Sequence, residues 1–251
     1  MSEEPVQVET RGRVLVVMLN RPAVKNVLNT GITAGLRAAV DQLEESDELT
    51  VGVVTGNGGS FCAGMDLKEF AVSGPPKGLT RFLRRGSEKP LIAAIEGVAF
   101  GGGLELALLC DILVAAEDAK LGLPEAKVGL FAAGGGLLRL PRRVPYGVAA
   151  ELVFTGRPLG AGEAKSYGLV SRVSAPGEAL ADAMSIAESV AANAPLAVAA
   201  SKQLLRLSSD LDESEFWEAQ APFAERVFRS ADAVEGPRAF AAKRAPQWSG
   251  S

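Results

Sequence analysis

The chain contains no histidine, and this absence excludes a large class of catalytic and metal sites. Without imidazole there is no Ser-His-Asp or Cys-His arrangement, and the commonest zinc ligand is missing. The two cysteines, Cys62 and Cys110, lie in apolar or glycine-rich surroundings, so we interpret them as reduced core thiols and not as a disulfide. No metal site is expected, and acid–base chemistry is left to carboxylates, Lys, Tyr or Cys.

The sequence also lacks a long apolar run and a positive net charge. It has no uncharged apolar stretch of about 18 residues, the length typical of a membrane-spanning helix. The segment Met1 to Pro5 is acidic where a secretory signal would be basic. A formal net charge of −4, without a stripe of basic and aromatic residues, argues against nucleic acid as a partner. We therefore expect a cytoplasmic protein with neither a nucleic-acid nor a membrane partner.

Alternating strand and helix patterns predict an α/β layered fold. The 251 residues, 47% of them hydrophobic, suffice for one domain with a sizeable core. Apolar spacing predicts a hairpin in the first 20 residues, a helix over Thr30–Glu45, and buried strands at Val51–Thr55, Leu91–Ile95 and Ile112–Ala116. Glycines and prolines predict a mobile loop with a short helix over residues 71 to about 88, a candidate cover for a site.

After Pro141 the pattern becomes helical, apart from a strand signal at Leu169–Val173. The helix patterns span Val144–Thr155, Gly162–Tyr167, Glu178–Ala192, Leu196–Ser208, Glu213–Phe228 and Asp232–Lys243. The C-terminal third is therefore predicted to be a helical appendage.

The most informative segment runs from Gly101 to Asp111, where three consecutive glycines precede an apolar helix pattern. Glycines leave the backbone N–H groups unobstructed, and the start of a helix favours negative charge, as in an oxyanion site. Glu105 lies in the first turn of this helix between leucines, where poor solvation raises the pKa of a carboxyl group. A second carboxylate follows at Glu125. This combination indicates proton transfer beside a carbonyl.

A second glycine-bounded turn, Ser60–Leu67, follows the Val51 strand and leads to a helix start near Asp66. It is a candidate second N–H donor, although an ordinary strand-to-helix loop capped by Asp66 explains it equally well. Its glycines do not have the G-x-G-x-x-G spacing of a dinucleotide site. Taken singly, Glu105 and Glu125 can also be helix-terminal acids; together with two glycine turns they favour a catalytic site.

Several segments together resemble the enoyl-CoA hydratase/isomerase (crotonase) superfamily. They are Asn20–Leu28, Ser60–Leu67, Gly97–Asp111 and Leu123–Gly129, with Thr155–Val170 also matching. The ending Ser230–Pro246, with Leu137–Pro141, is similar to carnitinyl-CoA dehydratase-like members. The resemblance implies a spiral of ββα units over residues 1–195 around a CoA thioester pocket. It also implies a C-terminal helical region, residues 196–251, that assembles homotrimers or dimers of trimers.

The resemblance also assigns roles to residues. It implies an oxyanion hole made by the backbone N–H groups of Met65 and Gly102, with Glu105 and Glu125 as the acid–base pair. One glutamate would activate water for attack at Cβ and the other would supply the proton at Cα, with the order open. The implied CoA contacts are Ala23, Val24, Lys25, Ala63, Asp66, Leu67, Gly101, Phe240 and Lys243, the last reaching a phosphate.

The glutamate pair favours an enoyl-CoA hydratase, a hydro-lyase of fatty-acid metabolism of the β-oxidation type. The CoA thioester would be its substrate, and no permanently bound cofactor is expected. Carnitinyl-CoA-type dehydration, Δ3,Δ2-enoyl-CoA isomerisation and acyl-CoA binding without turnover remain alternatives; a Rossmann-type oxidoreductase is disfavoured by the missing glycine fingerprint. Departures from the family pattern at Met65, Phe100 and Phe131–Ala133 predict an altered acyl specificity.

Overall fold

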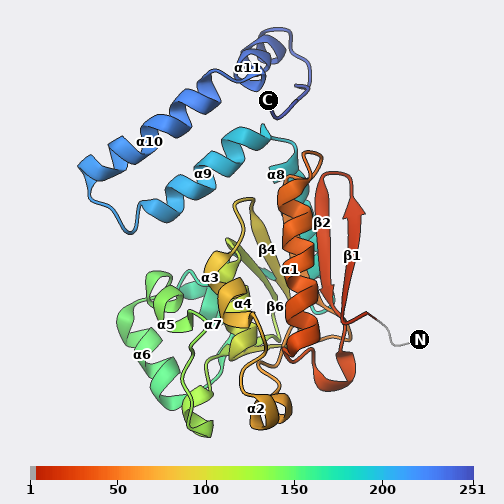
Figure 1. Ribbon diagram of the computed structural model, residues 1–251, viewed down its shortest axis with the longest axis vertical. Helices are drawn as coiled ribbons and strands as arrows, with labels where there is room; N and C mark the ends of the chain where they lie inside the picture. Colours follow the sequence, from red (N-terminus) through yellow and green to blue (C-terminus); the bar gives the residue numbers. More distant parts are fainter. Residues whose placement is uncertain (1–3) are drawn as a thin grey trace.

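The computed structural model describes residues 4–251 and shows an α/β core with a helical arm (Figure 1). The acidic start at residues 1–3 lies outside this range. Within it, six strands form the main sheet, in the spatial order β1 (Val6–Arg11), β2 (Val14–Leu19), β3 (Val51–Gly56), β4 (Leu91–Ile95), β6 (Ile112–Ala116) and β9 (Arg172–Ser174). β1 and β2 form an antiparallel hairpin, and the other neighbours are parallel. A smaller sheet joins β5 (Val98–Phe100), β7 (Lys120–Gly122) and β8 (Leu159–Gly160).

Both faces of the main sheet are covered, which explains why its central strands are apolar without interruption. On one face, Val53, Ile92 and Val114 pack against the small side chains of α8 (Ala179–Ala191). On the other face, Val54, Ala93 and Leu113 belong to a second core that includes α1 and α4. Successive residues of each strand therefore point to opposite faces of the sheet and pack in different cores.

The helices occur where apolar spacing and capping residues coincide. α1 (Thr30–Glu45) begins at Asn29, whose side chain accepts a hydrogen bond from the Ile32 N–H. The remaining helices are α2 (Leu67–Ser73), α3 (Leu79–Arg85), α4 (Gly102–Leu109), α5 (Gly136–Arg139), α6 (Tyr146–Thr155), α7 (Ala161–Ser166), α9 (Pro195–Leu207), α10 (Glu213–Phe228) and α11 (Ala231–Ala241). Short 3-10 turns lie at η1 (Pro22–Val24), η2 (Glu125–Val128) and η3 (Leu140–Arg142).

Most predicted elements are confirmed, and the errors concern short strands. The hairpin, α1 and the strands β3, β4 and β6 lie where predicted, and α3 is the short helix expected in the loop after residue 71. The strand predicted at Leu169–Val173 is displaced to β9, because the N–H groups of Leu169 and Val170 instead turn back to the Ala164 carbonyl. The strands β5, β7 and β8 were not predicted. Each has only two or three residues, too few for a recognisable alternation of apolar and polar side chains.

α9, α10 and α11 form an arm that extends from the core (Figure 1). α9 is anchored by Lys202, whose buried ammonium lies 2.8 Å from Asp111 and donates to the Lys89 carbonyl at 2.7 Å. α10 buries none of its residues. Among the described residues no single helix is long and apolar enough to cross a membrane; α8 and α9 meet that test only as a pair, bent by 111°.

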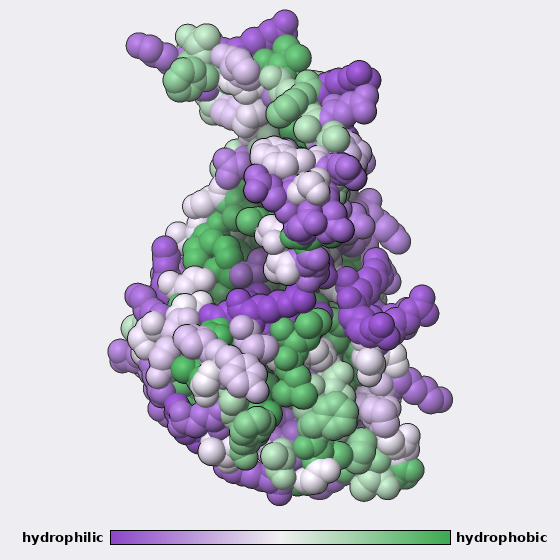
Figure 2. All heavy atoms as spheres, turned by 90° about the vertical axis from the view of Figure 1, so that its left-hand side faces the viewer, coloured by the Kyte–Doolittle hydropathy of each residue, from purple (hydrophilic) through white to green (hydrophobic). Residues whose placement is uncertain are grey.

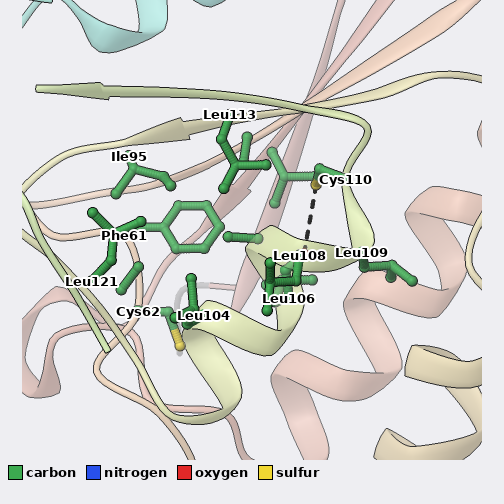
Figure 3. Packing of buried hydrophobic residues seen from close by; sticks show 14 of the residues in the cluster. Phe61, Cys62, Ile95, Leu104, Leu106, Leu108, Leu109, Cys110, Leu113 and Leu121 are labelled. Atoms are coloured by element: carbon green, nitrogen blue, oxygen red, sulfur yellow. Dashed lines mark hydrogen bonds between the residues drawn. The ribbon is translucent and has the colours of Figure 1, made fainter. Parts of the chain in front are cut away.

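The core beneath α4 is close-packed, and both cysteines lie in it as free thiols, as predicted (Figure 3). Phe61 is fully buried among Leu104, Ile95 and neighbouring side chains. At Gly103 the helix backbone approaches the Cys62 carbonyl so closely that an added Cβ would overlap this oxygen. Glycine at this position therefore sets the distance between α4 and the Ser60–Met65 turn.

We expect Gly103→Ala to lower the free energy of unfolding by about 1–3 kcal/mol, because the new methyl group must displace backbone. Gly147→Ala in α6 is the matched control: its Cβ meets nothing within 4 Å, so helix propensity should leave stability unchanged or slightly raised. Urea unfolding of the purified variants measures both. Equal stability of the two variants would contradict this account of the packing.

Candidate active site

The first element of the site is the turn that begins α4. Gly101, with φ 53° and ψ −126°, has a backbone conformation that favours glycine, and its N–H donates to the Gly122 carbonyl at 2.9 Å. Gly102 is the first residue of the helix, so its own N–H has no acceptor in the helix. This turn therefore places a free N–H group at the positive end of α4.

The second element is the Ser60–Leu67 turn, which runs beside the first. A bridge fixes its backbone: the Leu28 N–H donates to the Gly64 carbonyl at 2.7 Å, and the Asp66 N–H donates to the Leu28 carbonyl at 2.9 Å. Met65 lies between these two hydrogen bonds. The Asp66 carboxylate caps α2 at the Lys68 and Glu69 N–H groups and pairs with Arg21 at 3.0 Å, so the cap expected at Asp66 is confirmed.

The two turns bring the predicted N–H donors together. A Cβ on Gly102 would lie 3.7 Å from the Met65 nitrogen, and both residues line one cavity of about 370 Å³. Within residues 4–251 neither the Met65 nor the Gly102 N–H group donates a backbone hydrogen bond. Two backbone N–H groups without an acceptor thus lie close together in the wall of one cavity, and an oxyanion site requires donors of this kind.

Glu105 reaches the same cavity from the first turn of α4 and is only 5% exposed. Its Oε1 accepts a hydrogen bond of 2.9 Å from the Gly136 N–H. Burial raises the pKa of this carboxyl group, whereas the N–H groups of the Gly134–Gly136 turn and the positive charge of Arg139 act in the opposite direction. The Glu105 carboxylate is therefore poorly solvated and is held by the hydrogen bond from Gly136.

Glu125 lies at the start of η2, directly after Pro124, and also lines the cavity. Its Oε2 is buried and has no hydrogen-bond partner among the described residues. Burial raises the pKa of Glu125 from 4.5 to about 7, and the negative charge of Glu105 adds to this. Near neutral pH this carboxyl group is therefore available both as an acid and as a base.

Most of the cavity wall is apolar. Three of the predicted CoA contacts line the cavity: Ala63, Leu67 and Gly101. Three residues that depart from the family pattern also line it: Met65, Phe131 and Ala133. Phe100 is not among the lining residues, and its ring lies beside Gly122 of β7. The short helix expected to cover a site is α3, which lines the cavity with Leu79, Thr80 and Leu83. These three side chains were not named from the sequence, although the apolar residues at 79, 82 and 83 signal a helix face.

Other predicted contacts lie outside the cavity wall. Ala23, Val24 and Lys25 form the η1 turn next to the cavity, where the Lys25 carbonyl accepts a hydrogen bond of 2.9 Å from Ala63. Phe240, 87% exposed, and Lys243 lie at the end of α11, and α10 and α11 extend away from the core, so one chain does not bring them to this cavity (Figure 1). In residues 4–251, no three thiol or carboxylate groups are clustered so as to hold a metal ion.

The raised pKa of Glu125 predicts a pH-dependent stability difference. Below pH 4.5 the carboxyl is protonated in both folded and unfolded chains. Between 4.5 and about 7 only the unfolded chain ionises, so the free energy of unfolding falls as pH rises and stays lower above about 7. We expect Glu125→Gln to reduce this fall, and the exposed Glu117→Gln to retain it. Urea unfolding at about pH 5 and 8 tests this; equal falls in both variants would contradict a buried, unpartnered carboxyl.

Comparisons with known proteins point to one family. A family model described as enoyl-CoA hydratase/isomerase matches residues 9–251. An enoyl-CoA hydratase of Mycobacterium tuberculosis, EchA19, is 42% identical over 252 residues, covering 96% of this chain and 95% of that protein. A carnitinyl-CoA dehydratase of Proteus mirabilis is 38% identical over 261 residues, covering 98% of this chain and 99% of that protein.

A crystal structure of an enoyl-CoA hydratase from Mycobacterium tuberculosis H37Rv superposes with a TM-score of 0.94 at 47% identity, covering 99% of this chain and 100% of that one. The predicted resemblance and the crotonase-like α/β fold are thereby confirmed. With matches that extend over nearly its whole length, the chain belongs to the enoyl-CoA hydratase/isomerase family.

Proposed function

We propose that the chain is an enoyl-CoA hydratase, which adds water reversibly across the double bond of a 2-enoyl-CoA thioester. One observation carries this proposal: two free backbone N–H groups, the buried Glu105 carboxylate and the half-buried Glu125 carboxylate line the same cavity. A thioester carbonyl between the Met65 and Gly102 N–H groups is polarised, which makes Cβ electrophilic. Removal of one such donor typically lowers the rate by about 10²–10³.

The unequal surroundings of the two glutamates support different roles. Burial raises the pKa of Glu105, while the hydrogen bond from Gly136 and the charge of Arg139 oppose this rise, and Glu105 is proposed to accept a proton from water. The water oxygen bonds to Cβ, and the π electrons move toward the thioester as an enolate. Glu125, with a pKa of about 7, holds a proton near neutrality and delivers it to Cα as the enolate collapses.

The CoA portion is proposed to lie along the rim beside Ala63 and the η1 turn. Ala63, Leu67 and Gly101 line the cavity, and the turn of Ala23, Val24 and Lys25 lies beside Ala63. Asp66 would contribute through its backbone, because its carboxylate is committed to the α2 cap. Phe240 and Lys243 can take part only if another copy of the chain presents them.

The lining favours an uncharged acyl chain. Apart from Glu105 and Glu125, the wall that faces the acyl group is formed mainly by apolar side chains such as Leu79, Leu83 and Leu130. Apolar surface of this kind holds an alkyl group by the hydrophobic effect. We therefore propose fatty-acid-type 2-enoyl-CoA thioesters, as in β-oxidation, with the thioester as substrate and no permanently bound cofactor.

Carnitinyl-CoA-type dehydration is the second candidate. Phe131 favours it, because an aromatic ring in the cavity wall can hold a trimethylammonium group. The 38% identical relative carries the name of that activity. A panel of crotonyl-, longer 2-enoyl- and crotonobetainyl-CoA separates the two candidates by the substrate that is consumed.

We expect Glu105→Gln and Glu125→Gln each to lower kcat for hydration by at least about 10²–10⁴, because each removes one proton-transfer group. The loss of conjugated-enoyl absorbance measures the rate. The Kd of a saturated acyl-CoA, measured by calorimetry, should change little, since neither carboxylate is proposed to hold the CoA portion. Full activity of both variants would contradict the mechanism, and tight thioester binding without turnover in the wild type would favour a non-catalytic acyl-CoA-binding protein.

We also propose that residues 196–251 assemble the chain into homotrimers or dimers of trimers, with residues 1–195 as the catalytic core. The arm carries large hydrophobic side chains open to solvent in a single chain, including Trp217 at 59% and Phe228 at 78% exposure. Green hydrophobic groups stand open on the upper part of the molecule in Figure 2. Exposed apolar surface of this kind marks association sites.

Light scattering should give three or six times the chain mass of 26.0 kDa. Phe228→Glu should lower this mass, because a carboxylate disfavours a buried apolar contact. Val72→Glu is the matched control, since Val72 is 87% exposed but lies on α2, outside the arm. A monomeric wild type, or an equal change in both variants, would contradict the proposal.

A further inference from the structure

One half-buried arginine joins two walls of the cavity. Arg139, at the end of α5, donates from Nη1 to the Gly134 carbonyl at 3.1 Å and from Nη2 to the Leu83 carbonyl at 2.6 Å. Leu83 belongs to α3, and Leu83 and Gly134 both line the cavity. A single planar guanidinium thus fixes the α3 wall relative to the glycine turn before α5.

The same glycine turn encloses the Glu105 carboxylate. The Gly136 N–H donates to Oε1, and a Cβ on Gly134 would lie only 2.6 Å from Oε2. Between them Gly135, at φ 104°, leaves the space in which the Arg139 guanidinium lies, because a Cβ there would overlap Nη1. A shift of this turn would therefore move both the donor and the contact surface that orient Glu105.

We propose that Arg139 is a positioning residue, which holds Glu105 in its productive orientation by tying the Gly134–Gly136 turn to the C-terminal end of α3. Arg139 makes no ion pair with Glu105 in residues 4–251, so it acts through the turn. The expected effect of Arg139 on the rate rests on the proposed hydration reaction. Its effect on the orientation of Glu105 rests only on the contacts described above.

The electrostatics of the site are consistent with this role. The charged groups that act on Glu105 are Arg139 from α5 and Glu125 from η2, whereas α3 presents the apolar Leu83 to the cavity. The positive charge of Arg139 lowers the pKa of Glu105, against the larger effect of burial. Arg142, Arg143 and Arg206 surround Arg139 with like charge. Removal of the guanidinium should therefore both loosen the turn and favour the protonated form of Glu105.

The experiment compares Arg139→Gln, Arg139→Lys and the control Arg142→Gln, which removes a neighbouring arginine that pairs with Asp210 outside the cavity. We expect Arg139→Gln to lower kcat by about 10²-fold with a much smaller change in KM, because misplacing one reacting group costs rate more than binding. Carboxyl ¹³C NMR should show a higher titration midpoint for Glu105, with the signal assigned by its loss in Glu105→Gln.

Arg139→Lys keeps the charge but lacks the fork that spans two carbonyls, so it should restore the titration midpoint more than kcat. Arg142→Gln should match the wild type in both readouts. An unchanged Glu105 titration and kcat in Arg139→Gln, or equal changes in Arg142→Gln, would overturn the proposal. If the wild type hydrates no 2-enoyl-CoA, the proposed function fails, yet the titration still decides the role of Arg139.

Discussion

Two glycine turns approach each other so closely that their backbones share one side of the cavity, and the rest of the site depends on this approach. A Cβ on Gly64, at φ 111°, would lie 3.0 Å from the Phe100 carbonyl, so only glycine fits comfortably. The Ser60–Leu67 turn follows β3, and the Gly101 turn follows β5, the short strand that comes after β4. A parallel bridge between Cys62 and Ala99 of β5 aligns the two segments. This pairing thus brings the Met65 and Gly102 N–H groups together, although 37 positions separate them in the sequence.

Burial then gives similar carboxyl groups different properties. Glu105 and Glu125 are both poorly solvated, which raises the pKa of each. Glu105 accepts a hydrogen bond from the Gly136 N–H, whereas within residues 4–251 one oxygen of Glu125 is left without a partner. An unpartnered buried carboxyl oxygen is costly for folding, and its presence beside the proposed oxyanion donors favours a functional constraint. The proposed proton donor and proton acceptor therefore differ in their surroundings, not in residue type.

The sequence predicted those features that depend on local pattern. Periodicity located α1 and the central strands, and consecutive glycines located the start of α4 with Glu105 in its first turn. The lining residues of α3 and the contacts of Arg139 were not predicted, because they depend on segments far apart in the chain, such as Arg139 with Leu83. Phe240 and Lys243 lie on the arm, away from the cavity of one chain, so their predicted CoA contacts rest on the proposed assembly of several copies. The roles within the glutamate pair required hydrogen bonds and burial to separate them.

The central claim is that the Met65 and Gly102 N–H groups polarise the thioester carbonyl. Isotope-edited infrared spectroscopy of a ¹³C-labelled 2-enoyl-CoA, bound to Glu125→Gln so that turnover is suppressed, measures this polarisation directly. Two hydrogen bonds to the carbonyl oxygen should shift its stretching band to lower frequency than in water. A bound thioester whose carbonyl band coincides with that of the free thioester would contradict the account, because the free N–H groups would then serve no oxyanion.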